Sequence, residues 1–435
     1  MKHEECRPQV LDSVLKAVDA RRDEMVELAR ELIRFPTTKG NEAEAQAFYA
    51  EKLKELGAEV ESFEPDIEHL THDPAFVTDR KSFEGSPVVA ATLKGSGGGR
   101  SLILCGHMDV VDPGAAAWTH SPWDPVVKDG RVYGRGSVDM KGGVAAHYIA
   151  AKVIRDMGIE LRGDLKILST VDEECGSCGV LALIDRGYRA DAAICTEPVG
   201  LKITIATTGS VWFKISVPGK AAHGGIAYSG VNSIYKSIPI IERIRALEEE
   251  RRLRLFGSVP VYDGAPIAFC AGVNKIEGGV WPAIVPALTT LEGRVGLSPL
   301  EKVEDVKREL EDAVSATAKA DPWLSLHAPE IEYYKSRWNS GCVEEAHPFV
   351  EALRRSFAQS EGRDGVMAGM FACSDSGTLI TFGGTPAVDF GPGPQDMAHK
   401  TDEYVDIDDL VATSRVVAAT ILNWCGAADA GQTGL

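Results

Sequence analysis

The chain has 435 residues, of which 44% are hydrophobic and 25% charged, and its 64 acidic residues outnumber 46 basic ones to give a net charge of −18. This is the composition of a globular protein, and the length is typical of two to three domains. The acidity argues against binding to nucleic acid or to an anionic membrane, because such partners require a basic surface that displaces counterions. We therefore expect neither among its partners.

The cysteines and the amino terminus both indicate a cytoplasmic protein. Nine cysteines are an odd number, and they lack the spacing of a small disulfide scaffold, as is typical of reduced thiols. The first residues, MKHEECR, contain no apolar signal segment. No stretch approaches about 18 uninterrupted apolar residues. We therefore expect no secretory signal and no transmembrane helix.

The first half of the chain alternates helical and strand-like patterns. Apolar residues at helical spacing predict helices over residues 9–35, 42–56, 142–157 and 180–186. Apolar runs between them predict strands over residues 58–63, 88–93, 102–105, 165–171 and 192–195. Because such alternation requires βαβ crossovers, it predicts an α/β fold with a mixed, largely parallel sheet flanked by helices.

The pattern changes near Gly209, where a β-α-β-β-α-β order begins. Its segments are residues 210–217, 230–251, 267–276, 284–295, 299–317 and 330–334. This order predicts an α+β, ferredoxin-like sandwich. The α/β pattern then resumes, with helices at 347–359 and 407–425 and a strand at 387–390. We therefore predict an α/β domain made of residues 1–208 and 337–435, interrupted by an inserted domain at 209–336.

Side chains that bind metals follow several of the predicted strands. The residues that lie after these strands, or in the glycine-dense loop at 134–143, are His107, Asp109, Asp139, Glu173, Glu174, Glu197 and His399. Because ligands of open α/β sheets bind beyond the carboxyl ends of the strands, we expect these residues to converge on one site.

Imidazole and carboxylate groups are the ligands that Zn²⁺, Mn²⁺ and Co²⁺ prefer, and five ligands with one that can bridge suit two ions about 3.5–4 Å apart. Asp109 lies two residues beyond His107 on an extended segment, which allows it to orient the His107 ring. The neighbouring Glu173 and Glu174 diverge, so one can bind metal while the other acts as a general base. Taken singly, each residue also has a structural interpretation, as a strand-end histidine or a solvated acidic turn.

Five motifs together resemble one protein family. They are GHMDVV at 106–111, GRGSVDMKGG at 134–143, DEECGS at 172–177, TEP at 196–198, and GPG at 391–393 followed by His399 and Glu403. Over residues 25–420 the chain is similar to the dinuclear-metal acylases and peptidases, which include acetylornithine deacetylase, succinyl-diaminopimelate desuccinylase, aminoacylase and glutamate carboxypeptidase. The resemblance implies a zinc-exopeptidase-like fold and hydrolysis of a linear amide by a metal-bound hydroxide.

The resemblance also implies a role for each residue of the site. The implied ligands of two divalent ions, Zn²⁺ or alternatively Co²⁺ or Mn²⁺, are His107, Asp139 and Glu197 for one ion and Asp139, Glu174 and His399 for the other. By the same resemblance Glu173 is the general base and Asp109 is the partner of His107. The peptide bond between Asp139 and Met140 is expected to be cis.

The inserted domain gains a role from the same family. His223, in GKAAHGG at 219–225, resembles a histidine that reaches into the partner subunit's site to polarise the scissile carbonyl, which implies a homodimer. Asn274 resembles a second group that binds substrate, and Arg294 is a candidate for holding a substrate carboxylate. From the residues alone, a loop histidine without a role is the favoured interpretation of His223, and a surface ion pair is the alternative for Arg294.

The residues around Glu197 favour the deacylases of the family, so we predict removal of a small acyl group, such as acetyl or formyl, from an N-acylated amine or amino acid. No arginine occurs between Arg189 and Arg243, which argues against the succinyl substrate of the desuccinylases. The stretch 63–87 and the glycine run at 95–99 resemble the formylaminopyrimidine deformylases. A carboxypeptidase or dipeptidase is the alternative, and a catalytically silent metal-binding dimer is a third hypothesis.

Overall fold

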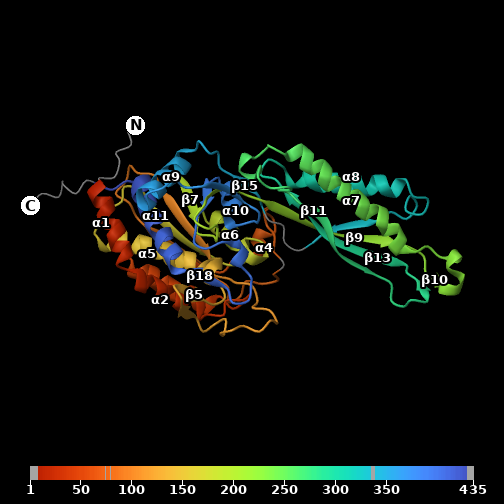
Figure 1. Cartoon of the computed structure of the whole chain (residues 1–435), viewed down its shortest axis with the longest axis horizontal. Coiled ribbons are helices and arrows are strands. Elements are labelled where there is room, and N and C mark those ends of the chain that lie inside the picture. Colours follow the sequence, from red (N-terminus) through yellow and green to blue (C-terminus); the bar gives the residue numbers. More distant parts are fainter. Residues whose placement is uncertain (1–7, 74, 79, 335–338, 429–435) are drawn as a thin grey trace, which may run out of the picture. The chain divides into compact units, whose positions relative to one another are not determined.

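The computed structural model describes residues 8–73, 75–78, 80–334 and 339–428, which fall into two compact units (Figure 1). Within these residues, unit 1 comprises the chain up to Thr207 together with Gly341–Met370 and the part from Ser374 onward. Unit 2 comprises Thr208–Ser340 and Phe371–Cys373. In the part of the chain described, no helix is long and apolar enough to span a bilayer.

Unit 1 is built on a nine-stranded sheet of order β1-β2-β6-β3-β7-β17-β8-β15, with β16 also paired to β8. The bounds of its strands are Glu59–Phe63 (β1), Val88–Leu93 (β2), Leu102–His107 (β3), Leu165–Thr170 (β6), Ala192–Cys195 (β7), Ile203–Thr207 (β8), Gly341–Cys342 (β15), Met367–Met370 (β16) and Ala387–Asp389 (β17). The central strands β6, β3, β7 and β17 are parallel, whereas β1, β2 and β15 pair antiparallel. The predicted mixed, largely parallel sheet is confirmed.

Helices cover both faces of this sheet, which explains why its central strands are buried along almost their whole length. Their bounds are Pro8–Asp19 (α1), Arg22–Ile33 (α2), Ala43–Glu55 (α3), Ile67–Leu70 (α4), Gly142–Asp156 (α5), Cys178–Asp185 (α6), Pro348–Glu361 (α9), Asp375–Thr381 (α10) and Ile407–Cys425 (α11). On one face of β3, Gly106 lies against Val144 of α5. On the other face, Ile103 and Cys105 share a core with residues of α6 and α10. A separate small sheet contains Val126–Lys128 (β4), Arg131–Tyr133 (β5) and Tyr404–Asp406 (β18).

The helix predicted over residues 9–35 is wrong in one respect, because it is two helices with a break at Ala20 and Arg21. Between the buried residues Val18 and Met25 the chain reads DARRDE, which offers the core no large apolar side chain. Helix α1 therefore packs against α11, while α2 turns to pack mainly against α5.

Unit 2 is an antiparallel four-stranded sheet of order β11-β13-β9-β14 with two helices packed on it. Its elements are Gly209–Pro218 (β9), Ser233–Leu255 (α7), Ala271–Gly278 (β11), Leu288–Leu297 (β13), Val303–Lys319 (α8) and Glu330–Tyr333 (β14). This is the predicted β-α-β-β-α-β order. Alternate residues of β9, such as Phe213 and Ile215, point into a core shared with both helices.

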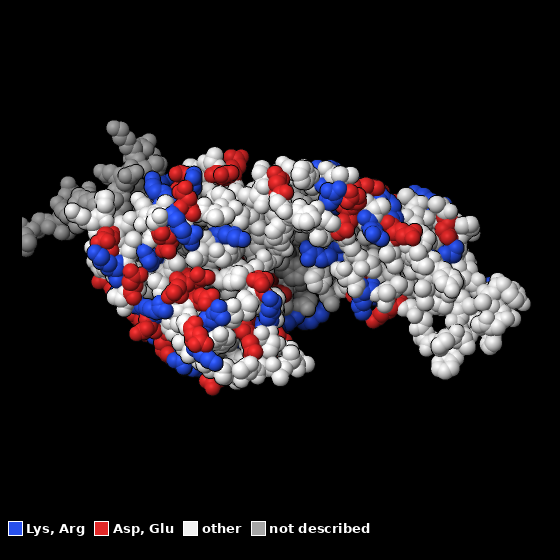
Figure 2. Space-filling view, viewed as in Figure 1, with Lys and Arg blue, Asp and Glu red and all other residues white. Residues whose placement is uncertain are grey.

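One strand predicted in unit 2, over residues 284–295, is divided. Pro286 has no backbone N–H to donate, so the pairing changes there. The short strand Ile284–Val285 (β12) pairs with Ala222–His223 (β10), and β13 begins after the proline. The end of unit 2 that carries β10 shows almost no charged side chains in Figure 2. Large apolar residues are exposed there, among them Tyr228, Val280 and Trp281.

Candidate metal centre

The predicted metal ligands of unit 1 lie at one edge of the sheet, where parallel strands end. His107 is the last residue of β3, Glu174 follows β6 by four residues, and Glu197 follows β7 by two. Asp139 lies in a short helical segment, Ser137–Lys141 (η1), that leads into α5. The strand order therefore brings together His107, Glu174 and Glu197, which are far apart in the sequence.

Asp139 occupies the centre of the cluster, with one histidine at each carboxylate oxygen. Its Oδ1 lies 3.1 Å from His107 Nε2, and its Oδ2 lies 3.2 Å from His399 Nε2. His399 Nε2 is also 3.1 Å from Glu174 Oε1, and His107 Nε2 is 4.0 Å from Glu197 Oε2. Asp139 therefore presents each of its two oxygens to a different histidine.

The charges of this cluster are unbalanced in a way that suits divalent cations. Burial and the neighbouring carboxylates raise the pKa values of Glu173 and Glu197 well above their ordinary values. Hydrogen bonds to Asp139 and Glu174 raise the pKa of His399 to about 10. Glu197 Oε1 is buried and has no hydrogen-bond partner among the residues described. A buried oxygen without a donor, beside several crowded carboxylates, fits a metal ligand.

Glu173, the predicted general base, lies beside the cluster. Its Oε2 is 4.0 Å from His107 Nε2, and its side chain is 9% exposed. The backbone N–H groups of Glu173 and Glu174 both point to the Asp109 carboxylate, at 3.3 and 3.2 Å. The two glutamates are therefore held on one turn, with Glu174 directed to His399.

Asp109 contacts His107 in an unexpected way. The His107 Nδ1–H donates to the main-chain carbonyl of Asp109 at 2.8 Å, whereas the nearest carboxylate oxygen is 3.7 Å away. This bond directs the other ring nitrogen of His107, Nε2, toward Asp139. The carboxylate of Asp109 instead accepts from the turn that carries the two glutamates. Asp109 thus connects two parts of the cluster.

A further acidic residue, Glu403, holds the backbone that carries Asp139, the central carboxylate. Glu403 is buried and forms an ion pair with Arg135, and its Oε1 accepts the N–H groups of Val138 and Asp139 at 3.0 and 3.2 Å. The sequence motif included Glu403, but nothing in the sequence indicated this contact. The peptide bond between Asp139 and Met140 is cis, as expected.

The candidate residues of unit 2 lie in two places. His223 is exposed at the end of β10, and its Nδ1 accepts the N–H of Gly225 at 3.1 Å. Asn274 is the extra residue of a bulge in β11, at a point where β-bulges re-aim side chains. Arg294 lies opposite Gly272 on the neighbouring strand β13, and its Nε is buried without a hydrogen-bond partner among the described residues. The structure thus places Asn274 and Arg294 on the four-stranded sheet, and His223 on the separate two-stranded sheet β10-β12.

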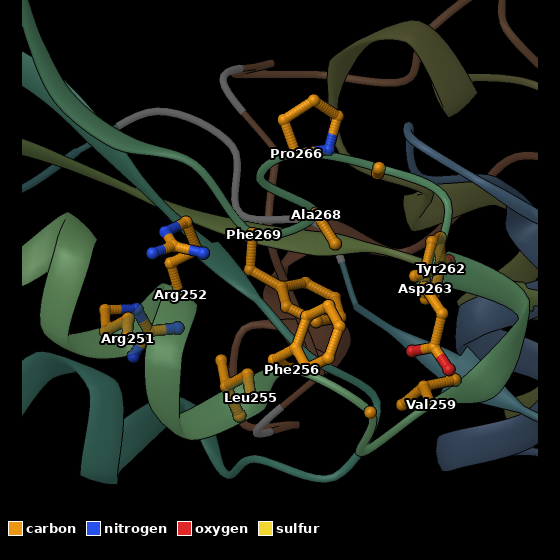
Figure 3. Close-up of a pocket in the computed structure, with 12 residues that line it drawn as sticks. Arg251, Arg252, Leu255, Phe256, Val259, Tyr262, Asp263, Pro266, Ala268 and Phe269 are labelled. Atoms are coloured by element: carbon orange, nitrogen blue, oxygen red, sulfur yellow. The ribbon is translucent and has the colours of Figure 1, made fainter.

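A small cavity of about 30 Å³ in unit 2 contains none of these residues (Figure 3). The end of α7 and the segment up to Phe269 line it, with Phe256 and Phe269 among the side chains. We do not assign it to the site.

Comparison with known proteins shows the family of this chain. Residues 103–423 match the model of peptidase family M20/M25/M40. The N-formyl-4-amino-5-aminomethyl-2-methylpyrimidine deformylase of Bacillus subtilis is 30% identical, over 96% of this chain and 98% of the relative. The acetylornithine deacetylase of Myxococcus xanthus is also 30% identical, over 86% and 97%.

Solved structures are similar in fold. The M20 family metallo-carboxypeptidase Sso-CP2 from Sulfolobus solfataricus has a TM-score of 0.73 at 18% identity, covering 93% of this chain and 99% of that one. The aminopeptidase PepT from Bacillus cereus has a TM-score of 0.72 at 23% identity, covering 92% and 98%. From the family match, the relatives and the residues gathered at the sheet edge, the chain belongs to peptidase family M20/M25/M40.

Proposed function

We propose that this protein is a metal-dependent amidohydrolase that removes a small acyl group, formyl or acetyl, from an N-acylated amine or amino acid. The observation that carries the proposal is the position of Asp139 between His107 and His399, with Glu173 beside them. The curated relatives named above are a deformylase and a deacetylase, which supports deacylation of an amide.

We propose two divalent ions, Zn²⁺ or alternatively Co²⁺ or Mn²⁺. The residues that would hold them are His107, Asp139 and Glu197 for one ion and Asp139, Glu174 and His399 for the other. Such ions, when bound, polarise an amide carbonyl and make a water molecule easier to ionise. The excess of buried carboxylates over imidazoles supports this assignment, because divalent cations would offset its negative charge.

Glu173 would transfer the proton. As a carboxylate, it takes one proton from the attacking water while the oxygen forms a bond to the acyl carbon. When the carbon–nitrogen bond breaks, the same proton passes from Glu173 to the leaving amine nitrogen. The products are a free carboxylic acid and an amine, and Glu173 is again a carboxylate. Burial raises the pKa of Glu173, which favours acceptance of this proton.

We propose that unit 2 completes the site as an inserted lid and dimerisation domain, residues 209–336, on a catalytic domain of 1–208 and 337–435. His223 would donate a hydrogen bond to the carbonyl oxygen as negative charge develops on it in the partner subunit. The exposed apolar residues near His223 support a second copy of the chain as the partner, since contiguous exposed patches of this kind mark interfaces. Their exposed fractions include 89% for Tyr228 and 90% for Val280.

Asn274 and Arg294 are proposed to bind the substrate. Asn274 lies in a bulge, outside the regular pairing of the ladder, and the Arg294 Nε–H is a buried donor without a hydrogen-bond partner among the described residues. A guanidinium can hold a carboxylate with two parallel hydrogen bonds. An N-acyl amino acid offers such a carboxylate, whereas a simple N-formyl amine does not, so Arg294→Gln should impair the first class of substrate selectively.

A substrate panel tests the proposed function. N-formyl and N-acetyl amines, led by an N-formyl aminomethylpyrimidine, are compared with dipeptides after the metal content has been measured by mass spectrometry. We expect cleavage of N-acyl amines that stops on chelation and returns when Zn²⁺ or Co²⁺ is restored. Efficient dipeptide cleavage without N-acyl amine cleavage would make the protein a dipeptidase. Absence of any turnover in a metal-loaded protein would favour a silent metal-binding dimer.

A further inference from the structure

The segment between β1 and β2 places an arginine in the interior of unit 1, close to the proposed base. The side chain of Arg80 is 2% exposed. It forms ion pairs with Glu42 and, through Nε at 2.8 Å, with Asp172 Oδ1. Its Nη1 donates to Ser86 Oγ at 2.9 Å, and Ser86 in turn donates to Glu42 at 2.7 Å. One guanidinium is thus bound on three sides by groups from separate parts of the chain.

Asp172 begins the turn that carries Glu173 and Glu174. Its φ of 71° lies in the left-handed region, which residues other than glycine adopt rarely. Its carbonyl accepts the N–H groups of Gly176 and Ser177 at 2.9 and 2.8 Å, which closes the turn. The direction of both glutamates therefore depends on how Asp172 is held.

The segment that bears Arg80 also touches this turn directly. Thr78 Oγ1 donates to Asp172 Oδ1 at 3.0 Å and also accepts the N–H of Arg80 at 3.1 Å. A Cβ at Gly176 would lie 2.1 Å from the carbonyl oxygen of Val77, so only glycine lets the two backbones approach this closely. The backbone near Val77 and Thr78 is therefore packed directly against the turn.

We propose that Arg80 is a positioning residue, which holds the turn 172–176 so that Glu174 reaches the metal centre and Glu173 reaches the substrate. The roles of the two glutamates rest on the proposed function above. Arg80 holds the turn through the Asp172 side chain. Asp109 holds it through the backbone N–H groups of Glu173 and Glu174. Without Arg80, the Glu42 and Asp172 carboxylates would be buried without a counterion, and the turn would move to reach water or a proton.

The experiment compares full-length Arg80→Gln and Arg80→Lys with the wild type. Zn²⁺ affinity is measured by competition with a chelator, which needs no substrate, and kcat and KM are measured on the best substrate of the panel. For Arg80→Gln we expect Zn²⁺ affinity and kcat each to fall by about 10- to 100-fold, as for other groups that support metal ligands. KM should stay within about threefold, because the substrate contacts are intact. Arg80→Lys restores a positive charge and should recover part of the lost affinity. The recovery should be incomplete, because one ammonium cannot pair with both carboxylates as a guanidinium does.

The control is Arg251→Gln, which removes a buried arginine from unit 2, where it pairs with Glu301 and Glu309. We expect this variant to lose stability but to keep wild-type Zn²⁺ affinity. Wild-type Zn²⁺ affinity in Arg80→Gln would overturn the proposal, and so would an equal loss of affinity in Arg251→Gln. A wild type that binds Zn²⁺ but hydrolyses no amide would refute the proposed function. The Zn²⁺ affinities of the variants would still test whether Arg80 positions the turn.

Thr78→Val serves if Arg80→Gln does not fold. This variant keeps the volume of a half-buried side chain and removes one hydrogen bond to Asp172. Because this bond is one of the contacts that hold Asp172 in place, we expect a decrease in Zn²⁺ affinity of about 10-fold. Unchanged affinity in a folded Thr78→Val protein would overturn the proposal.

Discussion

Arg80 in unit 1 and Arg251 in unit 2 are both buried, and each pairs with two carboxylates. Their partners differ. Glu42 and Asp172 are fully buried, whereas the partners of Arg251 are 14% and 23% exposed. Asp172 leads directly into the turn of the proposed base, while Glu301 accepts the N–H of Ser298 before helix α8. Burial and ion pairing are common to both arginines and therefore do not distinguish their roles. The distinction lies in what the paired carboxylate supports, because Asp172 begins the turn that carries the proposed base.

The same contrast extends to the two units as wholes. Unit 1 gathers carboxylates and imidazoles inside, at the end of a parallel sheet, where they are crowded enough to alter one another's pKa values. Unit 2 has an apolar core, and its candidate residues lie at a bulge, on a strand and at the exposed end of a short strand. We expect substitutions in unit 1 to affect metal binding and proton transfer, and those in unit 2 to affect stability or transition-state contacts.

The largest effect is expected for Glu173→Gln in unit 1. Removing the base should lower kcat by about 10²- to 10⁴-fold, the usual contribution of general base catalysis. Because Glu173 is not a proposed metal ligand, the metal content by mass spectrometry should equal that of the wild type. Turnover close to the wild-type rate would exclude Glu173 as the base.

The next effect is expected for His223→Ala in unit 2, which should lower kcat by about 10²- to 10³-fold through loss of a donor to the developing oxyanion. His327→Ala is the matched control, because His327 is also exposed in unit 2 but stacks on Trp323.

A mixing experiment shows whether His223 acts on its own subunit or on the partner. Glu173→Gln and His223→Ala proteins, each inactive, are combined and allowed to exchange subunits. If His223 acts across a dimer, one site of every mixed dimer has both residues intact, and about a quarter of wild-type activity should return. No recovery in verified mixed dimers would place His223 in its own subunit's site.

A smaller effect is expected for Arg251→Gln. Arg254 still pairs with Glu301 and Glu309 in this variant. The loss is therefore that of the buried guanidinium's own bonds to the two carboxylates, which should reduce the free energy of unfolding by about 1.5–3 kcal/mol. Urea unfolding followed by circular dichroism measures this change, and kcat of the folded protein should equal that of the wild type. A loss of kcat at unchanged stability would show that Arg251, like Arg80, supports the catalytic site.

The smallest effect concerns pH. His147 is buried in unit 1, 3.0 Å from both Tyr49 Oη and Thr196 Oγ1, and burial lowers its pKa to about 3. The unfolded chain binds a proton there below pH ~6.5, whereas the folded chain stays neutral, so the stability present above pH 6.5 is lost as the pH falls toward 3.

Between pH 7 and pH 5 this histidine should cost about 2 kcal/mol of unfolding free energy. His147→Gln should remove that part of the pH dependence, as measured by urea unfolding at the two pH values. In unit 2 both described histidines, His223 and His327, are exposed, so unfolding of unit 2 should lack this component. An unchanged pH dependence in His147→Gln would show that other groups are responsible.

Much of the fold follows from local patterns in the sequence. The short apolar strands, the β-α-β-β-α-β order of unit 2 and the helix Ile407–Cys425 were all predictable, because each needs only its own periodicity and turn residues. Errors occurred where packing decides. The split of α1 from α2 depends on which helix each one meets, and the interruption at Pro286 depends on a new strand partner.

The candidate site divides in the same way. Sequence determined which side chains stand at the strand ends, since a ligand such as His107 or Glu197 follows directly from its strand. Only the tertiary structure decided that the Asp109 carboxylate binds the glutamate turn, that Glu403 holds Asp139 from behind, and that Arg80 reaches Asp172. Those contacts join segments that are far apart in the chain. They form because buried charges need partners of opposite charge or hydrogen-bond donors, and a local sequence pattern does not indicate which distant residue supplies them.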